Sequence, residues 1–279
     1  MLRAVRTLFA SRSPSAYPVS VHRWLFDCPG ILHRDLSPNN IMCRLIQEIN
    51  AEGRSEQKAY GVLTDYDLSS WKKDLEGDYT KTSQQHTGTP PYMAQELLQG
   101  TSTTHLYRHD VESLFYVILL MAARHTIVSA KGGRGTEAES QVVMREGALP
   151  YQKWFDTQRY VTLGQSKESF FSRMPAIELS PAFEDFRPWL RAIRYDFSQG
   201  FKYQHFYSDN QAEVPPWRAG EATPAPVPFN DKTLGGRVGY STIIEPIQHL
   251  KGELEGLIIR YKITSPPLST PAGAVQADA

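Results

Sequence analysis

HRDLSPNNIM at residues 33–42 is the stretch around which the rest of the chain is organised. A short loop that turns back into a strand points Asp35 and Asn40 to the same side. A carboxylate placed there can orient a hydroxyl group and accept its proton, and an amide oxygen can bind a hard cation such as Mg²⁺. The stretch therefore predicts Asp35 as a base and Asn40 as a metal ligand. Taken alone, it is equally well explained as a surface turn.

Three further motifs follow this loop in the chain. GVLTDYD at residues 61–67 is typical of a short strand that ends in a metal-binding carboxylate, here Asp65. GTPPYMAQE at residues 88–96 comes next, and fourteen residues after it Asp110 begins a strongly apolar stretch. Apolar residues at spacings of three and four predict a buried helix over residues 110–124. The four motifs together are specific, although each alone is weak.

The motifs resemble the C-terminal lobe of a eukaryotic-type protein kinase, and more narrowly the fungal-type protein kinase domain. That subgroup has an HRD-(I/L)-S-x-N-N-I-M loop, a DFD-like triplet, a TGT-P-(F/Y)-M-A segment and an HD-x-E-S-x-F-Y-V helix. The matching residues here are 33–42, 65–67, 87–94 and 109–117. Gln95 departs from the pattern, which has proline there. A weaker similarity to a later W…K..F stretch lies at Trp154, Lys167 and Phe170.

The resemblance implies a mainly α fold of the α+β kinase type. We expect the large C-terminal lobe with a short β-hairpin pair and without a complete small β lobe. The expected organisation is an irregular and helical lead-in at 1–29 and a kinase-like lobe at 30–200. An aromatic and Pro-rich extension with a terminal helix follows at 201–262, and a disordered tail at 263–279.

The resemblance also implies transfer of the γ-phosphate of ATP to a protein hydroxyl, with Mg²⁺ bound beside the phosphates. Asp35 is then the catalytic base, with Arg34 and Thr89 beside it. Asn40 and Asp65 are the Mg²⁺ and ATP ligands. His33, Asp110 and Glu96 support the catalytic loop. We expect Glu96 to pair with a later arginine, for which the candidates are Arg173, Arg187, Arg191 and Arg194.

Several parts of a kinase are not found in the sequence. Only 32 residues precede His33, and we find no glycine-rich loop followed by a strand lysine and a helix glutamate. We therefore expect an incomplete chain that binds MgATP no more tightly than about 100 μM and transfers phosphate negligibly by itself. Two alternatives stay open: an inactive pseudokinase or scaffold lobe that binds protein, and a small-molecule phosphotransferase. The segment at 88–96 argues against the second alternative, because it shapes a platform for peptide substrates.

Composition limits the partners and the compartment. The 279 residues contain 30 Lys plus Arg and 30 Asp plus Glu, so no global charge favours nucleic acid or an acidic membrane. We expect a protein substrate or scaffold partner. Two cysteines are too few for a disulfide framework, and no apolar run is long enough to span a membrane. The arginines of the first 25 residues superficially fit a transit peptide, but a cytoplasmic or nuclear location is our prediction.

Local patterns add predictions for the remaining segments. We expect a helix over residues 17–26, and strands at 41–45 and 60–64 separated by an exposed insertion. We expect a polar insertion at 129–147, helices within 150–174, 182–193 and 242–262, and aromatic residues at 197–207 that belong mostly to the core. Threonines within residues 80–89, together with Arg34, make regulation by phosphorylation a further hypothesis.

Overall fold

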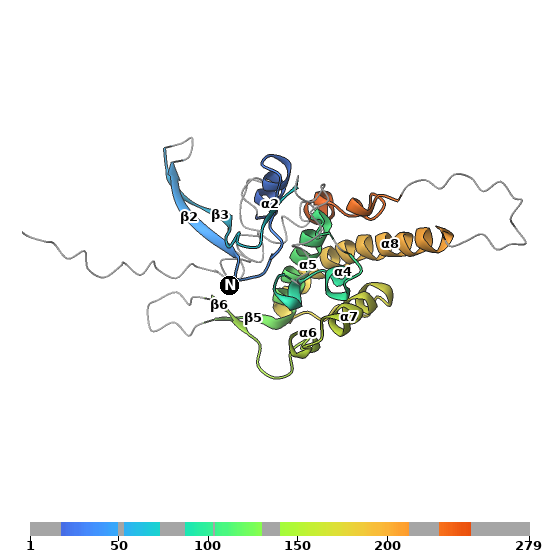
Figure 1. The fold of residues 1–279 in the computed structure, drawn as a ribbon. Coiled ribbons are helices and arrows are strands. Elements are labelled where there is room, and N and C mark those ends of the chain that lie inside the picture. Colours follow the sequence, from blue (N-terminus) through green and yellow to red (C-terminus); the bar gives the residue numbers. More distant parts are fainter. Residues whose placement is uncertain are drawn as a thin grey trace, which may run out of the picture.

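Helix α5, Tyr107–Arg124, lies at the centre of the molecule, and all of its residues are buried. In this computed structural model the described residues are 18–49, 53–72, 87–102, 104–129, 140–211 and 229–246. Figure 1 shows α8 lying beside α5. Helix α4 also lies next to α5, and α6 and α7 lie below these helices in this view. Apolar residues all round a helix require neighbours on every side, which explains why α5 is central.

The described elements are mostly helical, so the predicted mainly α fold is confirmed. The other helices are α2 (Pro18–Asp27), α4 (Gln95–Gln99), α6 (Lys153–Asp156), α7 (Tyr160–Ser172) and α8 (Arg187–Gln211). Short 3₁₀ turns are η2 (Pro90–Tyr92), η3 (Pro181–Phe186) and η5 (Asp231–Thr233), and residues 240–246 are helical. Three two-stranded antiparallel sheets pair β1 (Ile31–Leu32) with β4 (Ser70–Trp71), β2 (Ile41–Ile49) with β3 (Ser55–Leu63), and β5 (His125–Ser129) with β6 (Ser140–Met144).

An aromatic cluster joins the three longest helices. Phe115 of α5 lies 5.9 Å from Phe171 of α7, and Phe171 lies 5.4 Å from both Phe197 and Phe201 of α8, measured between ring centroids. Burial of each such side chain contributes on the order of 1.5–3 kcal/mol. Phe197 and Phe201 thus belong to the core as predicted, but Tyr203 and Phe206 are 47% and 65% exposed, so the prediction is confirmed only for the first half of this stretch.

The predicted insertion between the strands that follow the catalytic loop is wrong. Strand β2 continues to Ile49 and β3 starts at Ser55, with an unbroken register from Ile41↔Leu63 to Ile49↔Ser55. Backbone pairing carries this ribbon beyond the core, because strand hydrogen bonds form whatever the side chains are. Ile49 at its tip is 78% exposed, so the polar composition reflected solvent exposure and not an irregular loop.

Two other segment predictions need correction. Part of the predicted polar insertion at 129–147 is strand β6, which pairs with β5 in a second hairpin. The predicted helix at 182–193 instead begins with the 3₁₀ turn η3 and becomes α-helical at Arg187, where α8 starts. Helix α8 is continuous across residue 200, so the domain boundary that we placed there falls inside a helix.

Residues 229–246 pack against α8. Leu234 is fully buried, and a Cβ atom added at Gly200 would lie 2.7 Å from the Cβ of Leu234. Glycine at position 200 is therefore what allows the segment to approach the helix. The indole Nε1 of Trp189 donates a hydrogen bond to the carbonyl of Ile243 at 3.2 Å. The predicted terminal helix at 242–262 is described only to residue 246, and the predicted tail at 263–279 lies outside the described residues.

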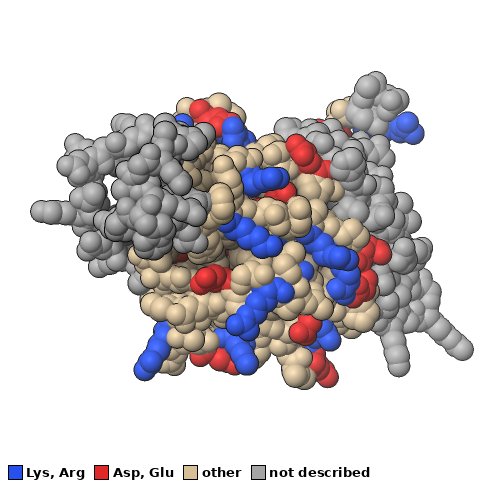
Figure 2. Space-filling view, turned by 90° about the vertical axis from the view of Figure 1, so that its right-hand side faces the viewer, with Lys and Arg blue, Asp and Glu red and all other residues tan. Residues whose placement is uncertain are grey.

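The surface carries charges of both signs, as equal numbers of acidic and basic residues require. Figure 2 shows Lys and Arg side chains interspersed with Asp and Glu on one face of the molecule. Within the described ranges, no helix combines the length and the apolar character needed to cross a membrane.

Candidate active site

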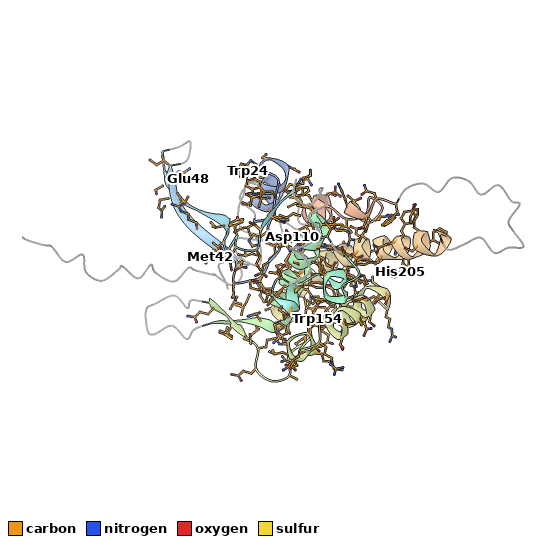
Figure 3. All side chains as sticks on the ribbon, viewed as in Figure 1. Trp24, Met42, Glu48, Asp110, Trp154 and His205 are labelled. Carbon is orange, nitrogen blue, oxygen red and sulfur yellow. The ribbon has the colours of Figure 1, made fainter. Side chains whose placement is uncertain are left out.

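Asp110 holds the backbone of the loop at residues 33–40. The carboxylate accepts hydrogen bonds from the N–H groups of His33 at 3.1 Å and Arg34 at 3.2 Å. The Nε2 atoms of His22 and His105 lie 2.8 and 2.7 Å from its two oxygens. An ionised carboxylate can only accept, so both imidazoles donate to it. Asp110 is fully buried at the centre of the molecule (Figure 3), and these four donors replace its lost hydration.

The electrostatics of this cluster favour the ionised form of Asp110. Burial by itself would raise the pKa of the carboxyl group, but the interactions with His105 and His22 outweigh burial and hold the pKa well below its ordinary value. Sequence reasoning predicted Asp110 as a support of the loop and missed both histidines. A lone histidine in a predicted helix, such as His22 in α2, carries no signal of its partner.

Asp35 is held by two segments that are far apart in the chain. Its Oδ1 accepts hydrogen bonds from the backbone N–H and the hydroxyl of Thr89, both at 2.9 Å. Asn40 donates through Nδ2 to the Asp35 carbonyl at 2.9 Å and to Oδ2 at 3.2 Å. Gly88 permits this approach: its φ is +123°, and an added Cβ would lie 3.3 Å from the carbonyl oxygen of Arg34. The structure thus brings Asp35, Asn40 and Thr89 together.

The base of the β2–β3 hairpin brings the two predicted metal ligands to the same end of the ribbon. Asn40 directly precedes β2, and Asp65 comes two positions after the end of β3, with Thr64 between them. The Thr64 N–H donates to the Asn40 carbonyl at 3.0 Å. Since Nδ2 of Asn40 is committed to Asp35, its Oδ1 is left to bind a cation. The Asp65 side chain is exposed, with the backbone at a φ of +62°.

Two oxygen ligands fit Mg²⁺ better than they fit a softer metal. The described part of the chain contains no cluster of three or more His, Cys, Asp or Glu residues that could hold a metal ion. Mg²⁺ usually keeps several waters and binds through one or two protein oxygens together with substrate phosphates. Asn40 and Asp65 match that pattern.

His33 connects the catalytic loop to the residue before Asp65. Its Nε2 lies 2.9 Å from the Thr64 carbonyl, and its Nδ1 lies 3.4 Å from the Asp35 N–H. A neutral imidazole protonated on Nε2 satisfies both contacts. Burial lowers the pKa of His33, although the nearby Asp110 carboxylate opposes this effect, so the neutral form is favoured at pH 7.

Arg34 reaches the segment that leads to Gly88. Its Nη2 donates to the Thr87 hydroxyl at 3.2 Å, and its backbone has a φ of +70°. Thr87 is one of the threonines in the phosphorylation hypothesis, but residues 80–86 lie outside the described residues.

Glu96 has a different partner from the four arginines predicted for it. Arg108 of α5 forms the ion pair, with a contact between Nη1 and the Glu96 carboxylate. Arg187 instead pairs with Glu184, and Arg194 donates to the Pro175 carbonyl. Burial opposes ionisation of Glu96, but hydrogen bonds from His109 and Arg108 outweigh it and lower the pKa to about 2. Arg108 was missed because it lies beside the motif residues His109 and Asp110 and has no motif position of its own.

Arg108 also ties the C-terminal segment to the site. Its Nη2 lies 2.8 Å from Oδ1 of Asp231, and its Nε donates to the Asp231 carbonyl. Gln204 of α8 donates to both Glu96 and Asp231. The guanidinium group of Arg108 therefore joins α5 to α4 and η5, and Gln204 of α8 contacts both of its acidic partners.

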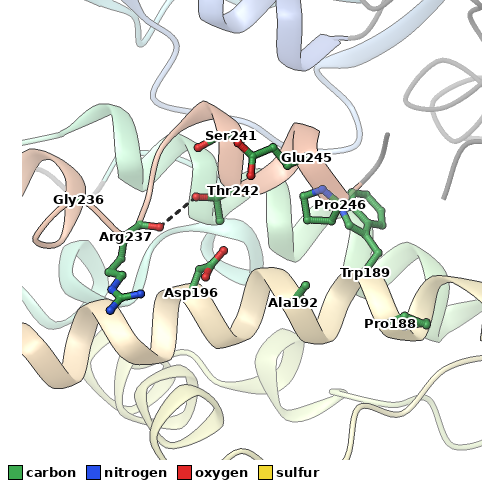
Figure 4. Close-up of a pocket in the computed structure, with 10 residues that line it drawn as sticks. All are labelled: Pro188, Trp189, Ala192, Asp196, Gly236, Arg237, Ser241, Thr242, Glu245 and Pro246. Carbon is green, nitrogen blue, oxygen red and sulfur yellow. Dashed lines mark hydrogen bonds between the residues drawn. The ribbon is translucent and has the colours of Figure 1, made fainter. Parts of the chain in front are cut away.

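A pocket of about 510 Å³ lies away from this loop, between α8 and the segment at 236–246. Figure 4 shows Asp196, Arg237 and Glu245 around it, with the Arg237 carbonyl accepting a hydrogen bond from the Thr242 hydroxyl. Burial raises the pKa of Asp196. None of the predicted site residues lines this pocket.

A mainly helical fold, a central helix that anchors a loop through a buried aspartate, and a later segment bound to that loop define a kinase-like domain. Residues 17–122 match the family model described as fungal protein kinase, which supports a fungal-type kinase domain in this part of the chain. The match includes the loop at residues 33–40, Asp65, the segment at 88–96 and nearly all of α5. The searches of curated proteins and of solved structures found no match.

Proposed function

We propose that this protein is a kinase that transfers the γ-phosphate of ATP to a hydroxyl group of a protein substrate. The observation that supports this most is the position of Asp35, which contacts both Asn40 of its own loop and Thr89 of the segment at 88–96. Phosphoryl transfer needs a base, a metal-binding oxygen and a substrate platform within a few ångströms of one another. These three groups meet that requirement.

Each predicted residue then has a role. Asp35 orients the substrate hydroxyl and accepts its proton, while Thr89 holds the carboxylate from the substrate side. Asn40 and Asp65 hold Mg²⁺, which when bound neutralises charge on the ATP phosphates. The remaining residues keep the loop in place through backbone and side-chain contacts: His33, Arg34, Glu96 and Asp110.

The proposed partner is a protein that presents a side-chain hydroxyl group, and the proposed setting is a reducing compartment. Support for the partner comes from the segment at 88–96, which lies directly against the base. Support for the compartment comes from the low cysteine content of two in 279 residues.

The test compares the whole chain with two single variants. Transfer of labelled phosphate from MgATP is measured on a generic basic protein and on the chain itself. Asp35→Asn keeps the size of the side chain but removes the base, so we expect transfer, which should already be slow in the wild type, to fall at least about 100-fold. The matched control is Asp27→Asn, which changes an exposed carboxylate paired with Arg23 on α2.

Two results would count against the proposal. Equal transfer by the wild type and Asp35→Asn would remove Asp35 as the base. Absence of transfer by the wild type, together with unchanged binding of a protein partner in Asp35→Asn, would favour the scaffold alternative.

A further inference from the structure

Lys167 of α7 is a fully buried cation that contacts the segment next to the candidate base. Its Nζ lies 2.6 Å from the carbonyl oxygen of Met93, 2.9 Å from that of Pro91 and 3.4 Å from that of Pro90. Residues 90–92 form the 3₁₀ turn η2, in which the Met93 N–H already donates to the Pro90 carbonyl at 3.2 Å. Carbonyls at the end of a helical turn lack partners within it, and the Lys167 ammonium group has donors for those of Pro91 and Met93 as well as a longer contact to that of Pro90.

Aromatic rings complete the surroundings of this ammonium group. Nζ lies 4.0 Å from the ring centroid of Tyr116 and 5.5 Å from that of Trp154. Ring faces attract cations, so the site compensates for the lost hydration of the charge. Burial lowers the pKa of Lys167, and the nearby Glu112 opposes the shift. The three carbonyls oppose it too, because only the ammonium form can donate to all of them.

The position of α7 relative to the segment is set by a backbone contact. A Cβ added at Gly164 would lie 2.9 Å from the Gln95 carbonyl and 3.1 Å from the Cβ of Leu98 in α4. Gly164 lies three residues before Lys167, on the same side of α7. Helix α7 therefore rests directly on α4 and places the lysine beneath residues 90–93.

A second buried side chain holds the start of α4. Glu112 of α5 accepts hydrogen bonds at Oε1 from the Gln95 N–H at 2.8 Å and from the Tyr116 hydroxyl at 2.7 Å. Ala94 at the N-cap of α4 makes no side-chain capping bond, so Glu112 supplies the acceptor from another helix. Within residues 90–95, Lys167 thus binds the carbonyl groups of the first part, and Glu112 binds the N–H group of the last residue.

Thr89 stands between Asp35 and this clamped segment. It donates to Asp35 and directly precedes the turn whose carbonyls Lys167 binds. We infer that Lys167 is a positioning residue: by holding residues 90–93 it sets Thr89 against Asp35 and shapes the surface that engages the protein substrate. The reference to a substrate rests on the proposed kinase function, whereas the link from Lys167 to Thr89 does not.

The first test needs no phosphate transfer. Hydrogen exchange of the Thr89 amide is measured by NMR in the whole chain, in Lys167→Met and in the control Lys202→Met, which alters an exposed lysine of α8. We expect Thr89 to exchange at least about tenfold faster in Lys167→Met, as loss of one hydrogen bond predicts. Amides in the middle of α5 should be unchanged in both variants.

Lys167→Gln is measured in parallel, because it keeps two donors on a shorter side chain. We expect an exchange rate for the Thr89 amide between those of the wild type and Lys167→Met. Unchanged exchange at Thr89 in a folded Lys167→Met protein would overturn the inference. Global unfolding of both variants would overturn it as well, since Lys167 would then support the whole core and not this segment.

The second test separates substrate engagement from nucleotide binding. If the wild type transfers phosphate, Lys167→Met should raise KM for the protein substrate or lower kcat, with KM for ATP unchanged. A wild type without measurable transfer would leave the exchange experiment, which decides the role of Lys167 independently of the proposed function. An equal rise in both KM values would indicate general loosening and contradict a positioning role.

Discussion

Asp35 and Thr89 are joined by two hydrogen bonds to one oxygen, because the backbone N–H and the hydroxyl of Thr89 both lie 2.9 Å from Oδ1 of Asp35. The two residues are 54 positions apart in the chain. This relationship fastens the segment at 88–96 to the catalytic loop. It also makes the geometry of Asp35 depend on residues that are remote in sequence.

Removing the hydroxyl of Thr89 should loosen this connection. In Thr89→Val the backbone donor stays and the bond from the hydroxyl to the carboxylate is lost. Hydrogen bonds to charged groups contribute about 1.5–3 kcal/mol, and partial exposure of the site places the expected loss of unfolding free energy near the lower value. Urea denaturation measures it. Thr89→Ser keeps the hydroxyl and should behave like the wild type, and equal stability of the valine variant would contradict the prediction.

Replacing Asp110 should destabilise the whole lobe. Asp110→Asn puts an amide NH₂ where a histidine and a backbone N–H now donate, so donors would face donors in a buried site. Loss of one partner in a buried charged cluster costs about 3–5 kcal/mol. Chemical denaturation at pH 7 measures this loss of unfolding free energy. A variant as stable as the wild type would mean that the contacts to His33 and Arg34 carry little energy.

Low pH should destabilise the protein by protonating Asp110. The pKa of Asp110 in the folded protein lies well below the value of about 3.9 expected in the unfolded chain. Its contribution is therefore fully present above about pH 4 and is lost as the pH falls through the folded pKa. Stability of the wild type should drop more steeply below pH 4 than that of Asp110→Asn. Parallel profiles of the two proteins would rule out a depressed pKa.

Replacing Arg108, the ion-pair partner of Glu96, should lower the free energy of unfolding more than replacing any of the arginines predicted from sequence. Arg108→Met leaves a largely buried Glu96 carboxylate without its cation, and we expect a loss of about 3 kcal/mol. Arg173→Met, at an exposed position after α7, should change stability by less than about 0.5 kcal/mol. Thermal and urea denaturation of the two variants make the comparison, and the reverse order would restore Arg173 as the partner.

Glu112 should make the protein less stable as the pH rises through the neutral range. Burial raises the pKa of Glu112 to about 7, from an ordinary value of 4.5, although contacts with Tyr116 and Gln95 lower it. Between those two values the unfolded state ionises while the folded state stays protonated, so stability falls by about 3 kcal/mol as the pH rises.

Glu112→Gln isolates this effect. The glutamine keeps an oxygen acceptor for the Gln95 N–H and the Tyr116 hydroxyl but cannot titrate. Denaturation at several pH values from 4.5 to 8 should show a decline for the wild type that is reduced in the variant. Identical slopes for the two proteins would contradict the raised pKa of Glu112.

Much of the site could be predicted because its motifs are local. The loop around Asp35, the strand before Asp65 and the apolar helix that begins near Asp110 each occupy a short run of residues. Backbone periodicity and loop length determine where such side chains point. Contacts between these runs could be predicted only through the family resemblance.

Other features depend on which surfaces meet in space. Four arginines were equally plausible partners for Glu96, and the structure selects Arg108 of α5 instead. Arg187 pairs with Glu184, and Arg194 donates to the Pro175 carbonyl. The full length of the β2–β3 ribbon was not predicted, because described polar residues such as Arg44 and Gln47 are exposed and composition does not distinguish an exposed strand from a loop.

The sequence by itself determined the central apolar helix and predicted the loop at residues 33–42 with its candidate base and metal ligands, since each follows from residue type and local spacing. Only the tertiary structure decided that His22 and His105 share Asp110, that Arg108 binds Glu96, and that Lys167 holds residues 90–93. The reason is physical: a buried charge must be satisfied by whichever donors or acceptors packing brings to it, and packing depends on the whole chain.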